Sequence, residues 1–293
     1  MNYKNYCSPL NKIKNNNNFS CYDNDSIIEL AKAYNTYINK KNVKNMCLRK
    51  KSKKPICSIK KVIDLNKSVK EIYYELIYRL KKICPMEYEW IKLPFVNEIK
   101  NTKRKRSLKK STFLPEQPHN KEAWLSTDNL NNSINQYEEL FDYLAKERGN
   151  LYFKFLGAQP SDISKISKIP WDELFKYNNI GIIFNTDTHN KPGKHWLAVY
   201  IDNKKRSIEY FDSLGDGPNK HIKHFLKTLL NKGYSFRHNV FAHQKGGSQC
   251  GQYSLTFIKH KLNGETFDEI VNNHSLFNDT EMIKERDKFF IPN

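Results

Sequence analysis

One cysteine of this chain occupies a position that would suit a nucleophile. Cys250 lies within QKGGSQCGQYS, residues 244–254, where a loop-like composition gives way to an expected helix. A thiol attacks as its thiolate, which a nearby base, a cation or the positive end of a helix dipole can stabilise. Gln244 and Gln249 are amide donors of the kind that an oxyanion hole needs, and Gly251 is expected to let the chain turn tightly. On this segment alone, an inert buried cysteine is the alternative.

A histidine and an aspartate are expected to meet across a β-hairpin. His195 begins the run HWLAVYID (195–202) and Asp212 lies near the end of RSIEYFDS (206–213), with a three-residue turn between the runs. In an antiparallel pair the first residue of one strand lies opposite the last residue of the next, so the two side chains should come almost face to face. An imidazole oriented by a carboxylate is the base that a cysteine nucleophile needs. Each residue taken alone is also an ordinary structural residue.

The segments around these residues predict an α+β domain that follows residue 114. An amphipathic helix comes first, strand-like runs follow, and the segment that leads to Cys250 enters a central helix. This order favours antiparallel strands packed against helices. The expected strands cover 180–187, 195–202, 206–213 and 234–244, and the expected helices cover 128–147, 218–232, 250–262 and 279–290.

The first 114 residues predict a separate, mainly helical region. Apolar residues at helical spacing indicate helices over 26–40 and 68–84, and the second opens on the capping box Ser68-x-x-Glu71. The other segments are expected to be a polar, loose arm over 1–24, a lysine-rich connector over 41–61 and a linker over 101–111.

Positive charge is concentrated in this first region. The formal net charge of the chain is +19, and residues 1–114 hold 27 lysines and arginines against 9 aspartates and glutamates, a net +18. Such a segment attracts polyanions through phosphate contacts that weaken with salt. Residues 1–114 could therefore bind DNA or an anionic core surface, and the basic run 103–106 could be a phosphate patch or an import signal. A lysine-rich composition without a binding role is the alternative.

Cysteine usage and hydropathy limit the class of protein further. The six cysteines, at positions 7, 21, 47, 57, 84 and 250, form no C-x-x-C pair and no regular framework. This scatter is expected of free thiols in a reducing compartment and argues against a zinc site. No apolar run reaches the roughly 18–20 residues of a transmembrane helix, and the N-terminal residues lack the apolar core of a secretory signal. We therefore expect no transmembrane segment.

The segments that hold the histidine, the aspartate and the cysteine resemble a known family. GKHWLAVYIDNKKRSIEYFDSLG, followed by HQKGGSQCGQYSL, is similar to the cysteine peptidases that include SUMO-specific proteases and the adenovirus protease. It resembles in particular the polyprotein-processing protease of African swine fever virus and related large DNA viruses. In that pattern His-Trp opens a strand, Asp or Asn ends the next, and Gln stands six residues before Cys-Gly. The matching residues are His195-Trp196, Asp212, Gln244 and Cys250-Gly251, and the resemblance covers about residues 120–293.

The resemblance implies a catalytic role for four of these residues. Cys250 would be the nucleophile, His195 the general base and Asp212 the group that orients the imidazole. Gln244 and the backbone N–H of Cys250 would form the oxyanion hole, with Gln249 as the second choice for the side-chain donor. The implied fold is a papain-like, SUMO-protease-like domain with a mixed sheet and a central helix that carries the cysteine. No metal or organic cofactor is implied.

The resemblance also implies how substrate would be bound. Trp124 and Trp196 match the two indoles that close a narrow tunnel over Gly-Gly in SUMO proteases, and Gly251 and Gln249 are expected to bind substrate as well. A tunnel of this kind admits only residues without a Cβ, which is a physical reason for Gly-Gly specificity. Packing in an ordinary aromatic core is the alternative for both tryptophans.

The implied function is a cysteine endopeptidase that cuts Gly-Gly-Xaa sites in viral structural polyproteins during virion maturation. Its expected locations are the host cytoplasm, at virus assembly sites, and the virion core. Removal of SUMO or ubiquitin-like proteins from conjugates is an alternative, because the same tunnel would serve it. An alternative of another class is a basic, nucleic-acid-binding core protein whose protease-like domain is inactive. The first 114 residues resemble no family that we recognise, and their lysine-rich content is expected to be particular to this protein.

Overall fold

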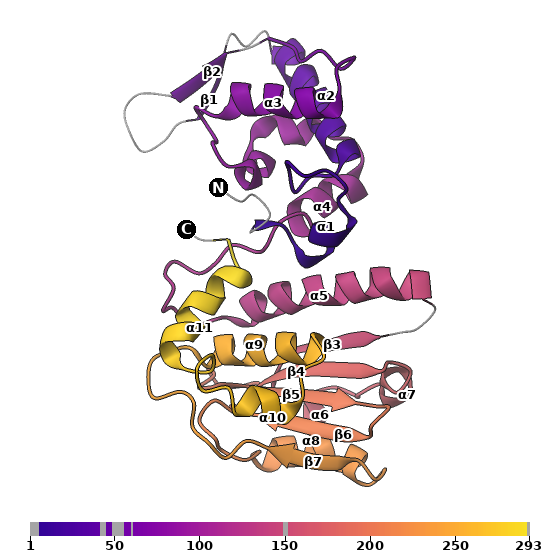
Figure 1. The fold of residues 1–293 in the computed structure, drawn as a ribbon, viewed down its shortest axis with the longest axis vertical. Helices are drawn as coiled ribbons and strands as arrows, with labels where there is room; N and C mark the ends of the chain where they lie inside the picture. Colours follow the sequence, from indigo (N-terminus) through magenta and orange to yellow (C-terminus); the bar gives the residue numbers. More distant parts are fainter. Residues whose placement is uncertain (1–5, 42–44, 49–55, 60, 149–151, 292–293) are drawn as a thin grey trace. The chain divides into compact units, whose positions relative to one another are not determined.

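The computed structural model describes residues 6–41, 45–48, 56–59, 61–148 and 152–291 of the chain. The contacts divide the chain into two compact units, Met1–Leu114 and Pro115–Asn293 (Figure 1). Much of the expected connector over 41–61 lies outside the described residues. Within the described ranges, every helix is too short or too polar to cross a lipid bilayer.

A five-stranded mixed sheet forms the centre of the second unit. The central pairs of strands are antiparallel, whereas each edge strand is parallel to its neighbour (Figure 1). The edges therefore differ from the antiparallel arrangement that the order of elements favoured. The strands follow the spatial order β3 (Phe153–Pro160), β4 (Asn179–Asn185), β5 (Trp196–Asp202), β6 (Ser207–Phe211), β7 (Ser235–His238).

Within this sheet, edge strand β3 is the strand that sequence patterns did not reveal. Its pairing with β4 shifts register between Phe155 and Ala158, and Gly157 within that shift has a φ of +94°. A bulge of this kind breaks the alternation of apolar and polar residues by which a strand is recognised. The pairing with β4 and the complete burial of Phe153 nevertheless make β3 an integral part of the sheet.

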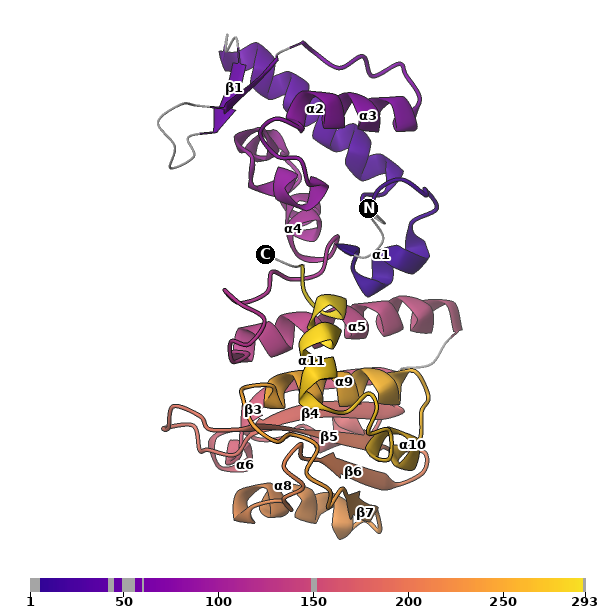
Figure 2. The same cartoon turned by 60° about the vertical axis from the view of Figure 1, so that its left-hand side comes forward.

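Helices cover both faces of this sheet, so its central strands are apolar on both sides. Along β5, Ala198 and Tyr200 face one core, while Leu197, Val199 and Ile201 face the other. The first core is covered by α5 (Thr127–Arg148), α9 (Cys250–Leu262), α10 (Phe267–Val271) and α11 (Asp279–Glu285), and the second by α6 (Ile163–Ile166), α7 (Trp171–Leu174) and α8 (Lys220–Leu230). Figure 2 shows α9 and α8 on opposite sides of the sheet.

The first unit is mainly helical, as the sequence predicts. The capping box at the start of α3 forms, because Ser68 and Glu71 each accept a hydrogen bond from the backbone N–H of the other. The elements are α1 (Pro9–Lys14), α2 (Asn24–Lys41), α3 (Val69–Leu80), α4 (Thr102–Lys110), the 3-10 segments Glu87–Lys92 and Pro94–Glu98, and the antiparallel pair β1 (Asn45–Leu48) and β2 (Ile56–Ile59).

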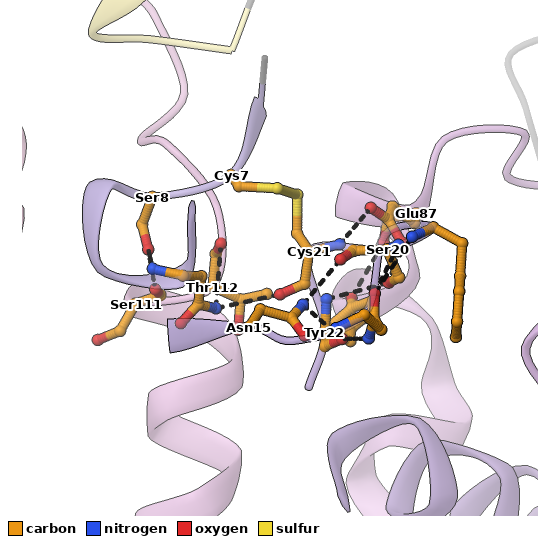
Figure 3. Close-up of a disulfide and its surroundings, with 12 residues drawn as sticks. Cys7, Ser8, Asn15, Ser20, Cys21, Tyr22, Glu87, Ser111 and Thr112 are labelled. Carbon is orange, nitrogen blue, oxygen red and sulfur yellow. Dashed lines mark hydrogen bonds between the residues drawn. A yellow bond between two sulfur atoms is a disulfide. The ribbon is translucent and has the colours of Figure 1, made fainter. Parts of the chain in front are cut away.

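The start of the chain is not the loose arm that its composition suggests. A disulfide joins Cys7 and Cys21, both of which are buried (Figure 3). The backbone of Ser8 donates to the carbonyl of Thr112, and the carboxylate of Glu87 accepts from the backbone N–H of Cys21. The prediction of free thiols is therefore wrong for this pair. Their Cα atoms come to 5.1 Å through contacts with residues about 70–100 positions away, which no cysteine spacing could indicate.

The predicted linker over 101–111 is also wrong, because these residues form α4. Asn101 caps the helix by accepting a hydrogen bond from the backbone N–H of Arg104, and Leu108 is buried. The guanidinium of Arg104 lies 3.1 Å from the carboxylate of Asp23 and 3.6 Å from that of Glu29. A single apolar residue gives no helical periodicity, so only the tertiary contacts reveal this helix.

Candidate active site

The first turn of helix α9 lies against the central strands and carries Cys250. The helix begins at Cys250, and the thiol is buried, with a relative exposure of 2%. No side chain caps the helix at Gln249, and the first backbone N–H groups of a helix have no partner within it. These N–H groups and the helix dipole place positive potential beside the sulfur.

His195 and Asp212 meet at the edge where β5 begins and β6 ends. Imidazole Nε2 lies 2.6 Å from Asp212 Oδ1, and both side chains are largely shielded from solvent. The contact differs in register from the expected one. Asp202 pairs with Ser207, which gives the hairpin a four-residue turn, so Asp212 lies two positions out of register with His195 and reaches it diagonally.

The pKa of His195 depends on both Asp212 and Cys250. Burial lowers the pKa of His195, but hydrogen bonds to Asp212 and to Cys250, together with their negative charges, outweigh burial and raise that pKa to about 9. Since Nε2 is taken by Asp212, Nδ1 is the nitrogen left for the sulfur. At neutral pH the imidazole is therefore protonated beside the sulfur, where it can serve as a proton donor.

Asn239, which the sequence analysis did not single out, holds Asp212 in place. Its Oδ1 accepts the backbone N–H of Asp212 at 2.9 Å, and its Nδ2 donates to the backbone carbonyl of Asp212 at 2.6 Å. Asn239 is buried, directly after β7. The backbone N–H of Leu214 adds a further bond to Asp212 Oδ1 at 2.9 Å. Nothing in the sequence separates Asn239 from the many other asparagines of this chain.

Gln244 lies beside this strand end, and its side chain is engaged within its own loop. Its backbone N–H donates to the carbonyl of Ser213, and the Ser213 hydroxyl donates to Gln244 Oε1 at 2.8 Å. The amide nitrogen Nε2 donates to the carbonyls of Gly246 at 3.1 Å and Gly247 at 3.2 Å. The structure thus brings Gln244 next to the residue after Asp212, and its role as an oxyanion donor stays a prediction.

The two tryptophans have different surroundings. Trp124 is half-exposed and lines a cavity of about 520 Å³ together with Glu122, Asp279 and the segment 246–249. Gln249, the second-choice donor, is part of this lining. Trp196 is 7% exposed and packs in the core, where its indole N–H donates to the carbonyl of Leu125 at 2.9 Å. Trp124 therefore lines a hollow beside Gln249, the residue before Cys250. Trp196 instead lies beneath the backbone of Leu125, the residue after Trp124.

Gly251 is not the turn residue that the sequence suggested. It lies within α9, is buried, and has no positive φ. A Cβ at this position would lie 3.0 Å from Cβ of Leu125 and 3.4 Å from Cδ2 of Leu130. The glycine lets the first turn of α9 pack closely against the segment that leads into α5. This packing accounts for Gly251 without a contact to substrate.

The arrangement is suited to acyl transfer by a cysteine nucleophile. In the part of the chain that the structure describes, no group of three or more His, Cys, Asp or Glu side chains could hold a metal ion. The site instead combines a buried thiol, an imidazole with a raised pKa and a fixed carboxylate.

Comparisons with known proteins agree with this chemistry. The sequence profile of the Ulp1 protease family, C-terminal catalytic domain, matches residues 138–291. A protein of Acanthamoeba polyphaga mimivirus, whose name describes it as a thiol protease, is 31% identical over 288 residues, which are 93% of this chain and 89% of that protein. A cysteine protease of African swine fever virus is 24% identical over 192 residues, 59% of this chain and 70% of that protein.

The fold is also found among solved structures. A crystal structure of an African swine fever virus protease matches with a TM-score of 0.60 at 22% identity, covering 76% of this chain and 91% of that one. The predicted fold class and the predicted family are therefore confirmed. The match to the mimivirus protein covers 93% of this chain and therefore extends into residues 1–114.

Proposed function

Because this chain belongs to the Ulp1 protease family and is a cysteine peptidase, we propose that it cleaves viral structural polyproteins after Gly-Gly. The observation that carries this proposal is the position of His195, bound to Asp212 and to Cys250 with its pKa raised to about 9. A nucleophile and a proton donor are thus both ready at neutral pH. The relatives named above are viral, which supports a substrate made by the virus itself.

In the proposed reaction the thiolate of Cys250 attacks the carbonyl carbon of the second glycine. The tetrahedral oxyanion would be stabilised by the backbone N–H groups at the start of α9, and by the Gln244 amide once it turns from the loop carbonyls. The His195 imidazolium protonates the leaving amine, which releases the product that begins with Xaa. Neutral His195 then takes a proton from water, and the resulting hydroxide equivalent hydrolyses the thioester.

The specificity for Gly-Gly is supported by the hollow near the nucleophile. The exposed indole of Trp124 and the backbone of Gly246 and Gly247 line it, directly before Gln249 and Cys250. An indole that covers a peptide leaves little space for a side chain at the residues beneath it. Glycine residues would fit there without displacing Trp124.

A Gly-Gly-Xaa peptide and a reporter fused to the C-terminus of SUMO test this proposal against its main alternative. We expect turnover of the peptide by the purified full-length chain, no turnover by Cys250→Ala, and unchanged turnover by Cys84→Ala, which removes another buried thiol outside the disulfide. Turnover of the SUMO reporter without the peptide would favour deconjugation instead. If neither substrate is cut, the inactive, nucleic-acid-binding alternative gains support.

We also propose that the first unit binds an anionic partner, with α4 as the contact surface. Lys103, Arg106 and Lys109 are exposed on this helix, while its single apolar residue, Leu108, is buried. A helix without exposed apolar side chains has nothing to insert into a lipid surface, so nucleic acid fits it better than a membrane does. Such a contact would keep the enzyme at assembly sites in the host cytoplasm and in the virion core.

Charge reversal on the exposed side of α4 tests this contact. The triple variant Lys103→Glu, Arg106→Glu, Lys109→Glu of the full chain should lose most of its salt-dependent affinity for duplex DNA, while peptide turnover is retained. DNA affinity that does not change in this variant contradicts the proposal. Retention on anionic vesicles but not on DNA would favour the membrane instead.

A further inference from the structure

The loop that joins β7 to α9 is held from within chiefly by the Gln244 amide, which donates to the carbonyls of Gly246 and Gly247. It contains Gln244 and ends at the nucleophile, and two of its residues are glycines. Gly247 has a φ of +70°, and no atom lies within 4 Å of the position of a Cβ on Gly246. A segment of this kind has many accessible conformations, so a precise arrangement of Gln244 requires contacts from outside the loop.

Ser213 contacts Gln244 from outside the loop, and Ser248 donates to the carbonyl of Glu122. The backbone between them is held by one carboxylate at the start of α11. Asp279 Oδ2 accepts the backbone N–H of Lys245 at 2.9 Å and that of Gly246 at 3.2 Å. Its other oxygen, Oδ1, accepts the hydroxyl of Tyr253 at 3.0 Å. Asp279 is the first residue of α11, and it follows Cys250 by 29 positions in the sequence.

Tyr253 connects this carboxylate with the helix of the nucleophile. It lies on the first turn of α9, three residues after Cys250, and it is fully buried. Its hydroxyl also lies 3.1 Å from the carbonyl of His243, the residue before Gln244. Burial and the charge of Asp279 raise the pKa of Tyr253, so the hydroxyl stays protonated and remains a donor. Through Asp279, the hydroxyl connects the backbone that follows Gln244 with α9, and it lies beside the carbonyl that precedes Gln244.

We propose that Asp279 is a positioning residue for the reaction, which fixes the backbone of the loop 244–249 so that the segment that carries Gln244 and lines the substrate hollow keeps its place relative to Cys250. The proposal rests on the proposed function of the site. Asp279 touches the loop and not the reacting atoms, so it acts through Gln244 and through the lining of the hollow. Its position at the edge of that lining is consistent with this role.

The proposal predicts different effects on turnover and on the reactivity of the thiol. Loss of an oxyanion donor costs about 10²–10³ in kcat, so a donor that is merely less well placed should cost on the order of tenfold. Alkylation of Cys250 by iodoacetamide forms no oxyanion and depends on the thiolate alone. Asp279→Ala should therefore lower kcat for the Gly-Gly-Xaa peptide about tenfold or more, while the alkylation rate of Cys250 stays within about twofold.

Three further variants make the test specific. Asn at position 279 can still accept both backbone N–H groups through Oδ1, so Asp279→Asn should recover most of the lost kcat. Tyr253→Phe removes one anchor of the carboxylate and should give an intermediate loss. Glu281→Ala removes another carboxylate of the same helix, one that pairs with Lys284 at 2.7 Å, and should behave as wild type.

Hydrogen exchange of the loop gives a readout that does not depend on any substrate. The amides of Lys245 and Gly246 should exchange faster in Asp279→Ala than in wild type or in Glu281→Ala, while exchange in β4 and β5 is unchanged. Equal exchange in these proteins overturns the inference, even if the Gly-Gly-Xaa peptide is not a substrate. Failure of wild type to cut the peptide, with the exchange result as expected, is a failure of the proposed function alone.

Two other outcomes also contradict the inference. Unchanged peptide turnover in Asp279→Ala would show that the loop holds its place without the carboxylate. A parallel fall in turnover, alkylation rate and melting temperature would show that Asp279 is a general fold contact without a specific effect on the loop.

Discussion

Replacement of Asp212 by asparagine is the most informative single change, because it removes a charge while nearly preserving shape. In wild type, His195 Nε2 lies 2.6 Å from the carboxylate of Asp212. The amide oxygen of the variant can still face Nε2 and can still accept the N–H of Leu214. The negative charge that favours the imidazolium is lost. The pKa of His195 should therefore fall from about 9 toward its ordinary value of 6.5.

The size of the effect follows from that difference in pKa. A pKa of about 9 against 6.5 corresponds to about 3 kcal/mol in favour of the imidazolium, which Asp212 shares with Cys250. If Asp212 supplies about half of that free energy, its loss lowers the pKa of His195 by about one unit, which is a tenfold change in the protonation equilibrium. Imidazolium is present below its pKa, so kcat/KM of wild type should fall with a basic limb near pH 9. In Asp212→Asn this limb should move down by about one pH unit or more.

The assay is the pH dependence of kcat/KM for a Gly-Gly-Xaa peptide between about pH 5 and 10.

The change of folding stability with pH offers a second check. The raised pKa of His195 stabilises the fold fully below pH 6.5, and this contribution is lost as pH rises through about 9, in wild type more than in the variant. A basic limb at the same pH in both proteins would refute the reasoning, because His195 would then not be held by the charge of Asp212.

Three other changes test the packing around the site and the first unit. Reduction of the disulfide, or replacement of Cys7 and Cys21 by serine, should destabilise the first unit by about 3 kcal/mol, since the bond closes a loop of sequence separation 14; thermal unfolding with and without reductant measures this. Gly251→Ala should lower the unfolding free energy by about 1–3 kcal/mol, because the new methyl group meets Leu125 at 3.0 Å; urea unfolding measures it. Asn239→Ala should lower kcat about tenfold or more by releasing the backbone of Asp212, which steady-state kinetics will show.

Each of these changes has a control within the chain. Cys84→Ser removes a buried thiol that is not in the disulfide, so reductant should affect its stability as it does wild type. Gly217→Ala adds a methyl group with only an ordinary contact, 3.8 Å from His238, and should cost little. Activity of Asn239→Ala at the wild-type level would show that strand β6 alone fixes Asp212.

The elements that depend on local pattern could be predicted from the sequence. Helix α9 begins at Cys250 as expected, since a loop of glycines and polar residues ends there and an apolar face begins. The hairpin of β5 and β6 follows from its two apolar runs, and it brings His195 to Asp212 even though the register differs from the expected one. The capping box of α3 could be predicted as well, because it depends only on the spacing of Ser68 and Glu71.

The elements that depend on distant contacts could not be predicted. The disulfide between Cys7 and Cys21 requires that both ends of the first unit fold together. Helix α4 is held by one buried leucine and by ion pairs of Arg104. Neither produces the repeating apolar positions by which a helix is recognised in a sequence. Asn239 and Asp279 act through backbone groups, so their residue types alone say nothing of their roles.

The central claim is that Cys250 is an activated nucleophile, through His195 and Asp212. The most direct measurement is the mass of the adduct formed with a Gly-Gly vinyl sulfone, mapped by peptide to one cysteine. We predict one adduct per chain, on Cys250, and its loss in His195→Ala at the same reagent concentration. An adduct on Cys84 or another cysteine, or labelling of Cys250 that does not depend on His195, would contradict the claim.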